Sequence, residues 1–177
     1  MNLEQLTTYL SEHFGGHIAG CRIDKGHVVA DVPLDRIEEL LEALKGDVEL
    51  EFDMLMDLTV VDWLERKPRF DVVYHLYSVH HNHRIRLVVG VDDGQAVPTA
   101  TRFWKIADWL EREMWDLYGV KFAGHPNLKR LLLYDEFKGH PLRKDYAYDH
   151  RQPRLEETWP SRDRQIKMPE GEKIHRP

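Results

Sequence analysis

Cysteine is nearly absent from this chain of 177 residues, which has only Cys21. A single thiol excludes a disulfide within the chain, and it cannot supply the set of thiolates that usually holds an iron–sulfur cluster. Structural zinc sites likewise need several Cys or His side chains at fixed spacing. The composition therefore excludes a conventional all-cysteine cluster, and it weakly indicates a reducing compartment.

Long apolar runs and basic leader segments are also missing. No run approaches the ~18 apolar residues of a membrane-spanning helix, and the first residues, MNLEQLTTYLSEHF, contain no basic segment followed by an apolar one. We therefore expect a soluble protein that associates with a membrane only through partners.

Positive charge is not in excess either. The formal net charge is −6 and the isoelectric point is near 6.0, whereas a nucleic-acid-binding protein needs a basic face. The sequence has no GxGxxG after a strand, no GxxxxGK[ST], no HExxH and no GxSxG. We expect no nucleic-acid partner, no cofactor bound by this chain and no catalytic residue of its own.

The hydrophobic pattern predicts one α+β domain. Apolar residues recur at helical spacing over residues 2–14 and 37–44, and each of these segments is followed by glycine. Alternation on both sides of a DKG sequence predicts a hairpin over residues 18–32. Three strand-like runs and a third helix follow, over residues 56–65, 70–80, 84–91 and 99–117. The order α-β-β-α-β-β-β-α, with one buried face per element, predicts a two-layer sandwich.

The third predicted helix combines tryptophans with several charges. At ~100° per residue, its core stripe consists of Phe103, Ile106, Ala107, Leu110, Met114 and Leu117. The shoulder of the stripe carries Trp104, Glu111 and Trp115, and the far side carries Arg112 and Asp116. A solvated shoulder would expose a large apolar area, so we expect the following loop or another chain to cover it.

After Gly139 the regular pattern disappears. Five of the nine prolines fall between Pro141 and Pro177, and isolated apolar residues such as Trp159 are scattered among charges. From Arg143 onward nine Lys/Arg stand against seven Asp/Glu, which makes this part mildly basic. Because such a segment cannot build its own core, we expect an extended C-terminal tail that is mobile in the free protein and ordered across a partner.

Four sequence elements stand in a fixed order at the end of the third helix and in the loops that follow it. They are ERE at 111–113, WDLYGV at 115–120, GHPNLKR at 124–130 and GHPLRKD at 139–145. This combination resembles the signature of the family formed by the C subunit of complex I, the proton-pumping NADH:quinone oxidoreductase. We accordingly divide the chain into an α+β domain (1–122), signature loops (123–146) and a partner-binding tail (147–177).

The resemblance implies a structural subunit of the hydrophilic arm of complex I, in the form that is not fused to the subunit that follows. Its neighbours would be the subunit that builds the quinone site and the subunit that carries the terminal cluster. NADH, FMN, the iron–sulfur clusters and quinone would be bound by other subunits. The arm lies on the cytoplasmic side of the bacterial inner membrane, or on the matrix side in mitochondria. The chain would then hold the electron-transfer site in place while electrons pass from NADH to quinone, coupled to proton translocation.

The resemblance also implies an interface between the signature residues and those neighbours. The predicted interface residues are Glu111, Arg112, Glu113, Asp116, His125, Lys129, Arg130, His140, Arg143, Lys144, Asp145 and Trp159. Arginine binds a carboxylate with two parallel hydrogen bonds, which suits this role. We further expect alanine at Arg112, Arg130 or Arg143 to leave the melting temperature of the isolated chain nearly unchanged, because exposed charge contributes little within a domain.

Two clusters suggest chemistry of another kind. The run His80-His81-Asn82-His83 offers metal ligands, but no carboxylate or Cys is adjacent in sequence and a polar hairpin tip explains the run as well. We therefore assign no metal site. Glu111 and Glu113 are candidate acid/base carboxylates, yet residues i and i+2 of a helix point ~200° apart and cannot act on one substrate.

His125 and His140 each lie between glycine and proline. Such a tripeptide ends a helix and starts an extended segment, because proline pushes the preceding residue into the β or polyproline region. This conformational role, a hydrogen bond to another subunit and proton transfer near a quinone all remain open, and the sequence favours the first.

Three other functions fit parts of the sequence. The signature is shared by homologous subunits of a ferredoxin-dependent plastoquinone reductase and of membrane-bound hydrogenases, which co-purified partners would distinguish. A stand-alone His-rich metal enzyme predicts stoichiometric metal in the isolated chain. A binding module unrelated to respiration predicts a compact, ordered tail.

Overall fold

The structure is a computed structural model that describes residues 1–149, 151 and 152. Most of the predicted partner-binding tail, including Trp159, lies outside the described residues.

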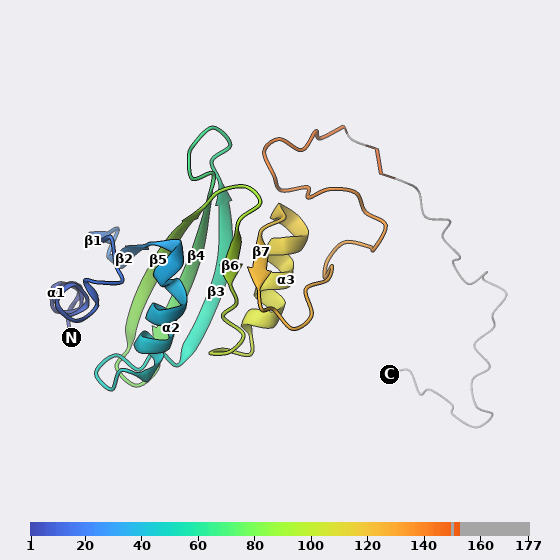
Figure 1. Ribbon diagram of the computed structural model, residues 1–177. Helices are drawn as coiled ribbons and strands as arrows, with labels where there is room; N and C mark the ends of the chain where they lie inside the picture. Colours follow the sequence, from blue (N-terminus) through green and yellow to red (C-terminus); the bar gives the residue numbers. More distant parts are fainter. Residues whose placement is uncertain (150, 153–177) are drawn as a thin grey trace, which may run out of the picture.

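Five strands form one sheet in the order β1-β2-β5-β4-β3 (Figure 1). They span Gly20–Asp24 (β1), His27–Val32 (β2), Met54–Asp62 (β3), Phe70–Ser78 (β4) and His83–Val91 (β5). The chain crosses from β2 to the far edge at β3 and returns through β4 to β5. Neighbouring strands are therefore antiparallel except β2 and β5, which run parallel.

Helices cover one face of this sheet (Figure 1). They are α1 (Leu3–Phe14), α2 (Ile37–Gly46) and α3 (Ala107–Tyr118), with a short 3-10 helix, η1 (Leu34–Arg36), before α2. The start of α1 is fixed by a capping box, in which the side chain of Asn2 accepts from Gln5 N and the side chain of Gln5 accepts from Asn2 N. Two further short strands, β6 (Ala96–Pro98) and β7 (Lys121–Ala123), pair in parallel beside α3.

The core lies between the helices and the sheet because each element has one apolar side. In β4, for example, Phe70, Val72, Tyr74 and Leu76 alternate along the strand and are at most 2% exposed. They pack under the helices in one apolar cluster. The side chains that alternate with them point to the opposite face of the sheet, which no helix of the described chain covers (Figure 1).

The predicted α+β sandwich is confirmed, and the order of its main elements matches the predicted order. The third helix, however, begins at Ala107 rather than near Thr99. The backbone N–H groups of the residues predicted to start the helix form other hydrogen bonds. Thr99 N donates to Ala123 O (2.9 Å), and Ala100 N donates to the carboxylate of Glu111 (2.6 Å). The β6–β7 pair was not predicted, since three-residue strands are too short to show a period.

The faces predicted for the third helix were wrong at several positions. Arg112 and Asp116, expected on the far side, are only 8% and 0% exposed, while Ile106, expected in the core stripe, is 48% exposed. Trp104 from the predicted shoulder is buried at 5% exposure. Arg112 and Asp116 are buried because the segment after β7 folds along the side of α3 away from the sheet (Figure 1) and covers that side as well.

Candidate functional site

The signature loops are organised around the carboxylate of Asp116 in α3. One oxygen of Asp116 accepts the backbone N–H groups of Leu131, Leu132 and Leu133, at 3.0, 2.9 and 2.9 Å. The other oxygen accepts from the guanidinium of Arg130 at 2.6 Å. Burial acts to raise the pKa of the fully enclosed Asp116 carboxyl, but the backbone donors and Arg130 outweigh it and lower this pKa. Asp116 is therefore an anion that folds the loop onto the helix.

Arg130 connects this anion to the second signature loop. Its Nη2 donates to Phe137 O at 2.6 Å and to Gly139 O at 3.3 Å. The guanidinium also lies over the rings of Trp115 and Phe137, 5.8 and 5.6 Å from their centroids. One side chain thus joins α3, the first loop and the start of the second loop.

Arg112, one turn before Asp116, holds the same loop by its backbone. It donates from Nε to Lys129 O at 3.2 Å and from Nη2 to Arg130 O at 3.0 Å. Its guanidinium also stacks over Trp109, 5.3 Å from the ring centroid. The two polar residues predicted to face away from the core are therefore the residues that attach the signature loop to the helix.

Both Gly-His-Pro histidines form hydrogen bonds within the chain. His125 accepts Asn127 N at Nδ1 (3.0 Å), so its Nε2 carries the proton that it shares with Asp108 O at 3.2 Å. His140 donates from Nδ1 to the backbone carbonyl of Asp116 at 2.9 Å. The ring of His140 rests against Gly119, where φ is +80° and an added Cβ would come within 2.7 Å of it. Neither tripeptide ends a helix, because α3 ends at Tyr118, β7 precedes Gly124 and the described residues just before Gly139 form no helix. The two histidines instead hold their loops against α3 through hydrogen bonds within the chain.

Glu111 faces the other way, into the domain. It is 0% exposed and accepts from Thr99 Oγ1 and Ala100 N, both at 2.6 Å. Burial raises the pKa of Glu111 to about 7, against the two hydrogen bonds, which lower it. The hydroxyl of Tyr74, also fully buried, has no hydrogen-bond partner among the described residues, and the charge of Glu111 adds to the burial that raises the pKa of Tyr74. Glu111 therefore holds residues 99 and 100, which precede α3, against the helix from inside the domain. Glu113 is half-buried, whereas Glu111 is enclosed.

The second signature loop is held by an ion-pair network around Arg69. Arg69 binds Asp62 with two hydrogen bonds of 2.8 Å and reaches Asp145 at 2.9 Å. Lys144 N also donates to Asp62, at 2.8 Å. The Arg69 guanidinium keeps the pKa of Asp62 and of Asp145 well below the usual range. Two residues of the loop are thus fixed to the β3–β4 hairpin.

Arg143 completes this network from the loop side. Its guanidinium binds Asp93 at 3.0 and 2.5 Å and Asp145 at 3.1 and 3.2 Å. The side chains of Arg130 and Arg143 are only 13% and 16% exposed. The sequence-based expectation that these arginines are exposed is therefore wrong, and with it falls the reason to expect a small effect on the stability of the chain.

The remaining predicted interface residues lie nearer the surface. Lys129 and Lys144 are exposed, and Glu113 is half-buried. Lys144 Nζ lies over the ring of Trp63, 5.8 Å from its centroid. Whether these residues contact a neighbour stays a prediction.

Sequence reasoning missed two groups of residues. Asp62, Arg69 and Asp93 stand 50 or more residues from the loop they bind and carry no local signal. The second group consists of exposed apolar side chains beside α3, namely Ile106 at 48%, Trp109 at 55%, Leu132 at 60% and Leu142 at 50%. The exposure of Trp109 cannot be predicted from the sequence, because it depends on where α3 begins and on where the following loop lies.

The histidine run at the β4–β5 turn contains a possible metal-ligand set. Glu51 brings a carboxylate to His80 and His81, and one ligand atom of each lies within 4.8 Å of the others. This carboxylate could not be expected from the sequence, because nothing there shows that the α2–β3 connection reaches the turn. His81 Nε2 already lies 3.0 Å from Val48 O.

Among the described residues, no helix is long and apolar enough to cross a membrane. The three helices of the fold have 12, 10 and 12 residues, and each has a polar side.

Comparison with known proteins gives consistent results. Residues 30–152 match the family model for the respiratory-chain NADH dehydrogenase 30 kDa subunit. The C subunit of the NADH-quinone oxidoreductase of Rhizobium rhizogenes is 45% identical over 144 residues, which cover 81% of this chain and 72% of that protein. The corresponding subunits of Maricaulis maris and Paramagnetospirillum magneticum are 42% and 41% identical, over 81% of this chain and 72% and 73% of theirs.

A solved structure has the same fold. A chain of the membrane-bound sulfane sulfur reductase, an archaeal respiratory membrane complex, superimposes with a TM-score of 0.69. The match covers 82% of this chain and 85% of that chain, at 24% identity. At this identity the likeness extends to the fold alone.

Proposed function

The chain belongs to the family of the 30 kDa subunit of respiratory-chain NADH dehydrogenase, and we propose that it acts there as a clamp, built from α3 and residues 123–149, that positions neighbouring subunits. It is the C subunit of the NADH:quinone oxidoreductase, a non-redox subunit of the peripheral arm of complex I. The family carries no cofactor itself. Its contribution to electron transfer is therefore the placement of other subunits.

The main support for a clamp is that buried polar residues hold the signature loops against α3. Arg112, Asp116 and Arg130 bind the backbone of the loop instead of leaving it to solvent. A loop fixed in this way loses little conformational entropy when a partner binds, and preorganisation of this kind strengthens binding.

We call α3 together with the loop bound to it, residues 123–149, the α3 platform. Its outer surface would supply the contacts with the partner subunits. Because the backbone of residues 129–133 faces the helix, Leu132 points outward and is 60% exposed. Trp109, at 55%, and Ile106, at 48%, extend the apolar surface toward the start of α3. Exposed apolar residues that gather on one surface mark protein interaction sites, and tryptophan and arginine are enriched in the centre of such interfaces.

Within the predicted interface we propose two roles. The enclosed members, such as Glu111 and Asp116, shape the platform, while the exposed Lys129 and Lys144 make contacts with carboxylates of a partner. The partners are the subunit that builds the quinone site and the subunit that carries the terminal cluster, on the cytoplasmic side of a bacterial inner membrane. Trp159 lies outside the described residues and remains in the proposal, because a tryptophan among charges is a suitable anchor for a partner.

The relatives favour this enzyme over the related machines that share the signature. Those of Rhizobium rhizogenes, Maricaulis maris and Paramagnetospirillum magneticum are subunits of NADH-quinone oxidoreductases, at 41–45% identity. They likewise favour a subunit over a stand-alone metal enzyme.

The experiment is to assemble the complex with Trp109→Ala or Leu132→Ala in the full-length chain. Loss of a central apolar contact weakens an interface by more than about 1 kcal/mol, or roughly fivefold. We expect a smaller fraction of the chain to be retained in the purified complex. The melting temperature of the isolated chain should be unchanged for Leu132→Ala and slightly lower for Trp109→Ala, which loses the contact with Arg112. Cross-linking mass spectrometry on the wild-type complex identifies the neighbours.

The matched control is Val48→Ala, which removes an apolar side chain that is 76% exposed and lies away from α3, between α2 and β3. It should not change retention. Full retention of Trp109→Ala and Leu132→Ala would show that partners bind elsewhere on the chain.

A further inference from the structure

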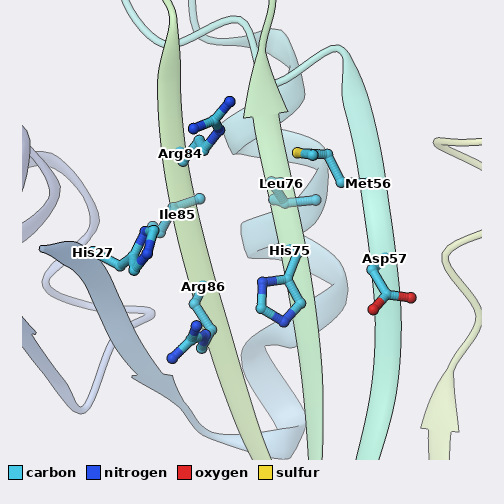
Figure 2. A pocket seen from close by; sticks show the side chains of 8 residues that line it. All are labelled: His27, Met56, Asp57, His75, Leu76, Arg84, Ile85 and Arg86. Atoms are coloured by element: carbon cyan, nitrogen blue, oxygen red, sulfur yellow. The ribbon is translucent and has the colours of Figure 1, made fainter. Parts of the chain in front are cut away.

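The sheet face opposite the helices contains a hollow that the proposed clamp does not use. It lies over the middle of β5, β4 and β3, with β2 at its edge (Figure 2). The lining residues are His27, Met56, Asp57, His75, Leu76, Arg84, Ile85 and Arg86. We call it the open-face hollow.

Strand pairing brings its charged residues together. His75 is the register partner of Asp57 on β3 and of Arg86 on β5, so the three stand in one row across the sheet. Arg84, two residues along β5, projects from the same face, and Figure 2 shows His27 on the β2 side of Arg86. Cross-strand neighbours on one face have Cβ atoms ~5 Å apart, so these groups act on one another.

The two arginines of the hollow lack carboxylate partners among the described residues. Within residues 1–149, 151 and 152, no ion pair joins Arg84 or Arg86 to a carboxylate, although Arg84 stacks on Tyr77 at 5.0 Å. Other arginines of the strands and their loops are matched, as Arg22 is with Asp31.

His75 responds to this positive field. Burial lowers the pKa of His75, and the charges of Arg86 and His27 lower it further, against the single carboxylate of Asp57. Asp57 is therefore outnumbered by the cationic groups around the hollow. Of the two arginines, Arg86 is half-buried and Arg84 is exposed. A half-buried charge without a counter-ion is costly, and an anion from outside would offset that cost at Arg86.

Met56 lines the hollow, and Met54 extends its apolar surface along β3. Met54 and Met56 on β3 are 49% and 50% exposed. Methionine and arginine are both enriched in protein interfaces, where methionine adapts its shape to the partner. A free inorganic anion would use the arginines and leave the methionines unburied, whereas a protein segment would bury both.

We propose that the open-face hollow binds an acidic segment of a second protein subunit, whose Asp or Glu carboxylate lies between Arg84 and Arg86 while apolar side chains cover Met54 and Met56. Arginine suits this ligand because its guanidinium binds a carboxylate with two parallel hydrogen bonds. The surface is separate from the α3 platform, so the subunit would be held on both faces of its domain.

A lysine at position 86 tests the proposal in the assembled complex. Arg86→Lys keeps the positive charge and provides an amine that a carbodiimide joins directly to a neighbouring carboxylate. We expect a covalent link from position 86 to an Asp or Glu of another subunit, identified by mass spectrometry. The same amine should react with an amine reagent at least about tenfold more slowly in the complex than in the isolated chain.

Arg102→Lys is the matched control for the chemistry. Arg102 pairs with Glu38 on the helical side, so its replacement should link to Glu38 within the chain, in the complex and in the isolated protein alike. This control shows that the reagent works, whatever happens at position 86.

Three outcomes would overturn the proposal. One is an amine at position 86 that reacts equally fast in the complex and in the isolated chain. Another is a link to Asp57 alone. The third is protection of the isolated chain by millimolar phosphate without further protection on assembly, which would identify a site for small anions. None of these outcomes depends on the α3 platform, since Trp109→Ala and Leu132→Ala test that surface separately.

Charge removal gives an independent result. Arg84→Gln combined with Arg86→Gln should lower retention of the chain in the complex by about tenfold, because an interfacial charge pair is lost. The isolated double variant should be at least as stable as the wild type, since neither arginine has a carboxylate partner within the described chain and the uncompensated charge is removed. Unchanged retention would contradict the proposal.

Discussion

The carboxylate of Asp116 and the guanidinium of Arg130 lie 2.6 Å apart, and each of them also binds backbone groups of the loop that follows Arg130. The pair is nearly removed from water, with side chains 0% and 13% exposed. A buried ion pair is stable only when its remaining hydrogen-bonding groups are satisfied. Here the backbone of residues 131–139 satisfies them, so the pair and the loop conformation depend on each other.

Asp116→Asn should therefore destabilise the chain strongly. Asparagine has nearly the same shape, but its NH2 group would face either Arg130 or the three backbone N–H donors, none of which can accept a hydrogen bond. Breaking a buried pair from one side costs about 3–5 kcal/mol. Urea unfolding of the full-length chain measures the change.

Asp135→Asn is the control for this variant, because Asp135 is exposed in the same loop. It should change the free energy of unfolding by less than about 0.5 kcal/mol. If Asp116→Asn were equally mild, the loop would not depend on the ion pair.

Arg143→Lys tests the second network. Lysine keeps the charge but cannot bind Asp93 with two parallel hydrogen bonds while also reaching Asp145. We expect a loss of about 1–2 kcal/mol in the free energy of unfolding. Arg102→Lys, at an exposed pair with Glu38, should change it by at most about 0.5 kcal/mol, and similar losses in both variants would mean that the bidentate geometry is unimportant.

The same arginines show where sequence reasoning reached its limit. The α+β sandwich follows from periodic apolar patterns, which are local and can be read directly. The attachment of the loops depends on pairs far apart in sequence, such as Arg69 with Asp145, for which no local pattern exists. The signature was therefore interpreted as free for partners, when much of it first folds the chain onto itself.

Burial on both sides of α3 explains the errors on that helix. A wheel of ~100° per residue assigns one buried face, and it placed Arg112 and Asp116 in solvent. Such a wheel cannot represent a loop that returns over the polar side. The expectation that the Gly-His-Pro tripeptides end a helix was wrong, because α3 ends at Tyr118 and its C-cap is Gly119. His140 is instead bound to the end of α3 by its side chain, and a role in proton transfer stays untested.

Gly119→Ala should release His140 from the helix. The substitution faces backbone strain at φ +80° and a Cβ 2.7 Å from the His140 ring. Gly94→Ala is a matched control, because φ there is +86° and nothing lies within 4 Å of the added Cβ. Strain alone costs about 1 kcal/mol, and Gly119→Ala should cost at least about 1 kcal/mol more.

Fluorescence distinguishes the two glycine variants further. The ring of Trp115 lies 6.1 Å from that of His140, so movement of His140 should change the emission attributable to this residue. A Trp115→Phe background assigns the change to that residue. Equal free energies of unfolding for the two variants would show that His140 moves aside at no cost.

Glu111 should make the chain less stable as the pH rises through neutrality. The pKa of Glu111 is raised from 4.5 to about 7 in the folded chain, so the folded state binds this proton more tightly than the unfolded state. Stability from this group is present below the unfolded pKa and is lost as the pH rises through the folded pKa. The loss amounts to about 3 kcal/mol in all, of which about 2 kcal/mol falls above pH 5.5.

Glu111→Gln should remove this decline between pH 5.5 and 8.5. Glutamine can still accept from Ala100 N through its carbonyl and donate to Thr99 Oγ1, and it has no charge to bury. The variant should therefore equal or exceed the wild type in stability at pH 8.5. Glu113→Gln, on the same helix but half-buried, should keep the wild-type decline. Urea unfolding at each pH decides the matter, because the same pH dependence in the wild type and in Glu111→Gln would mean that Glu111 ionises without penalty inside the domain.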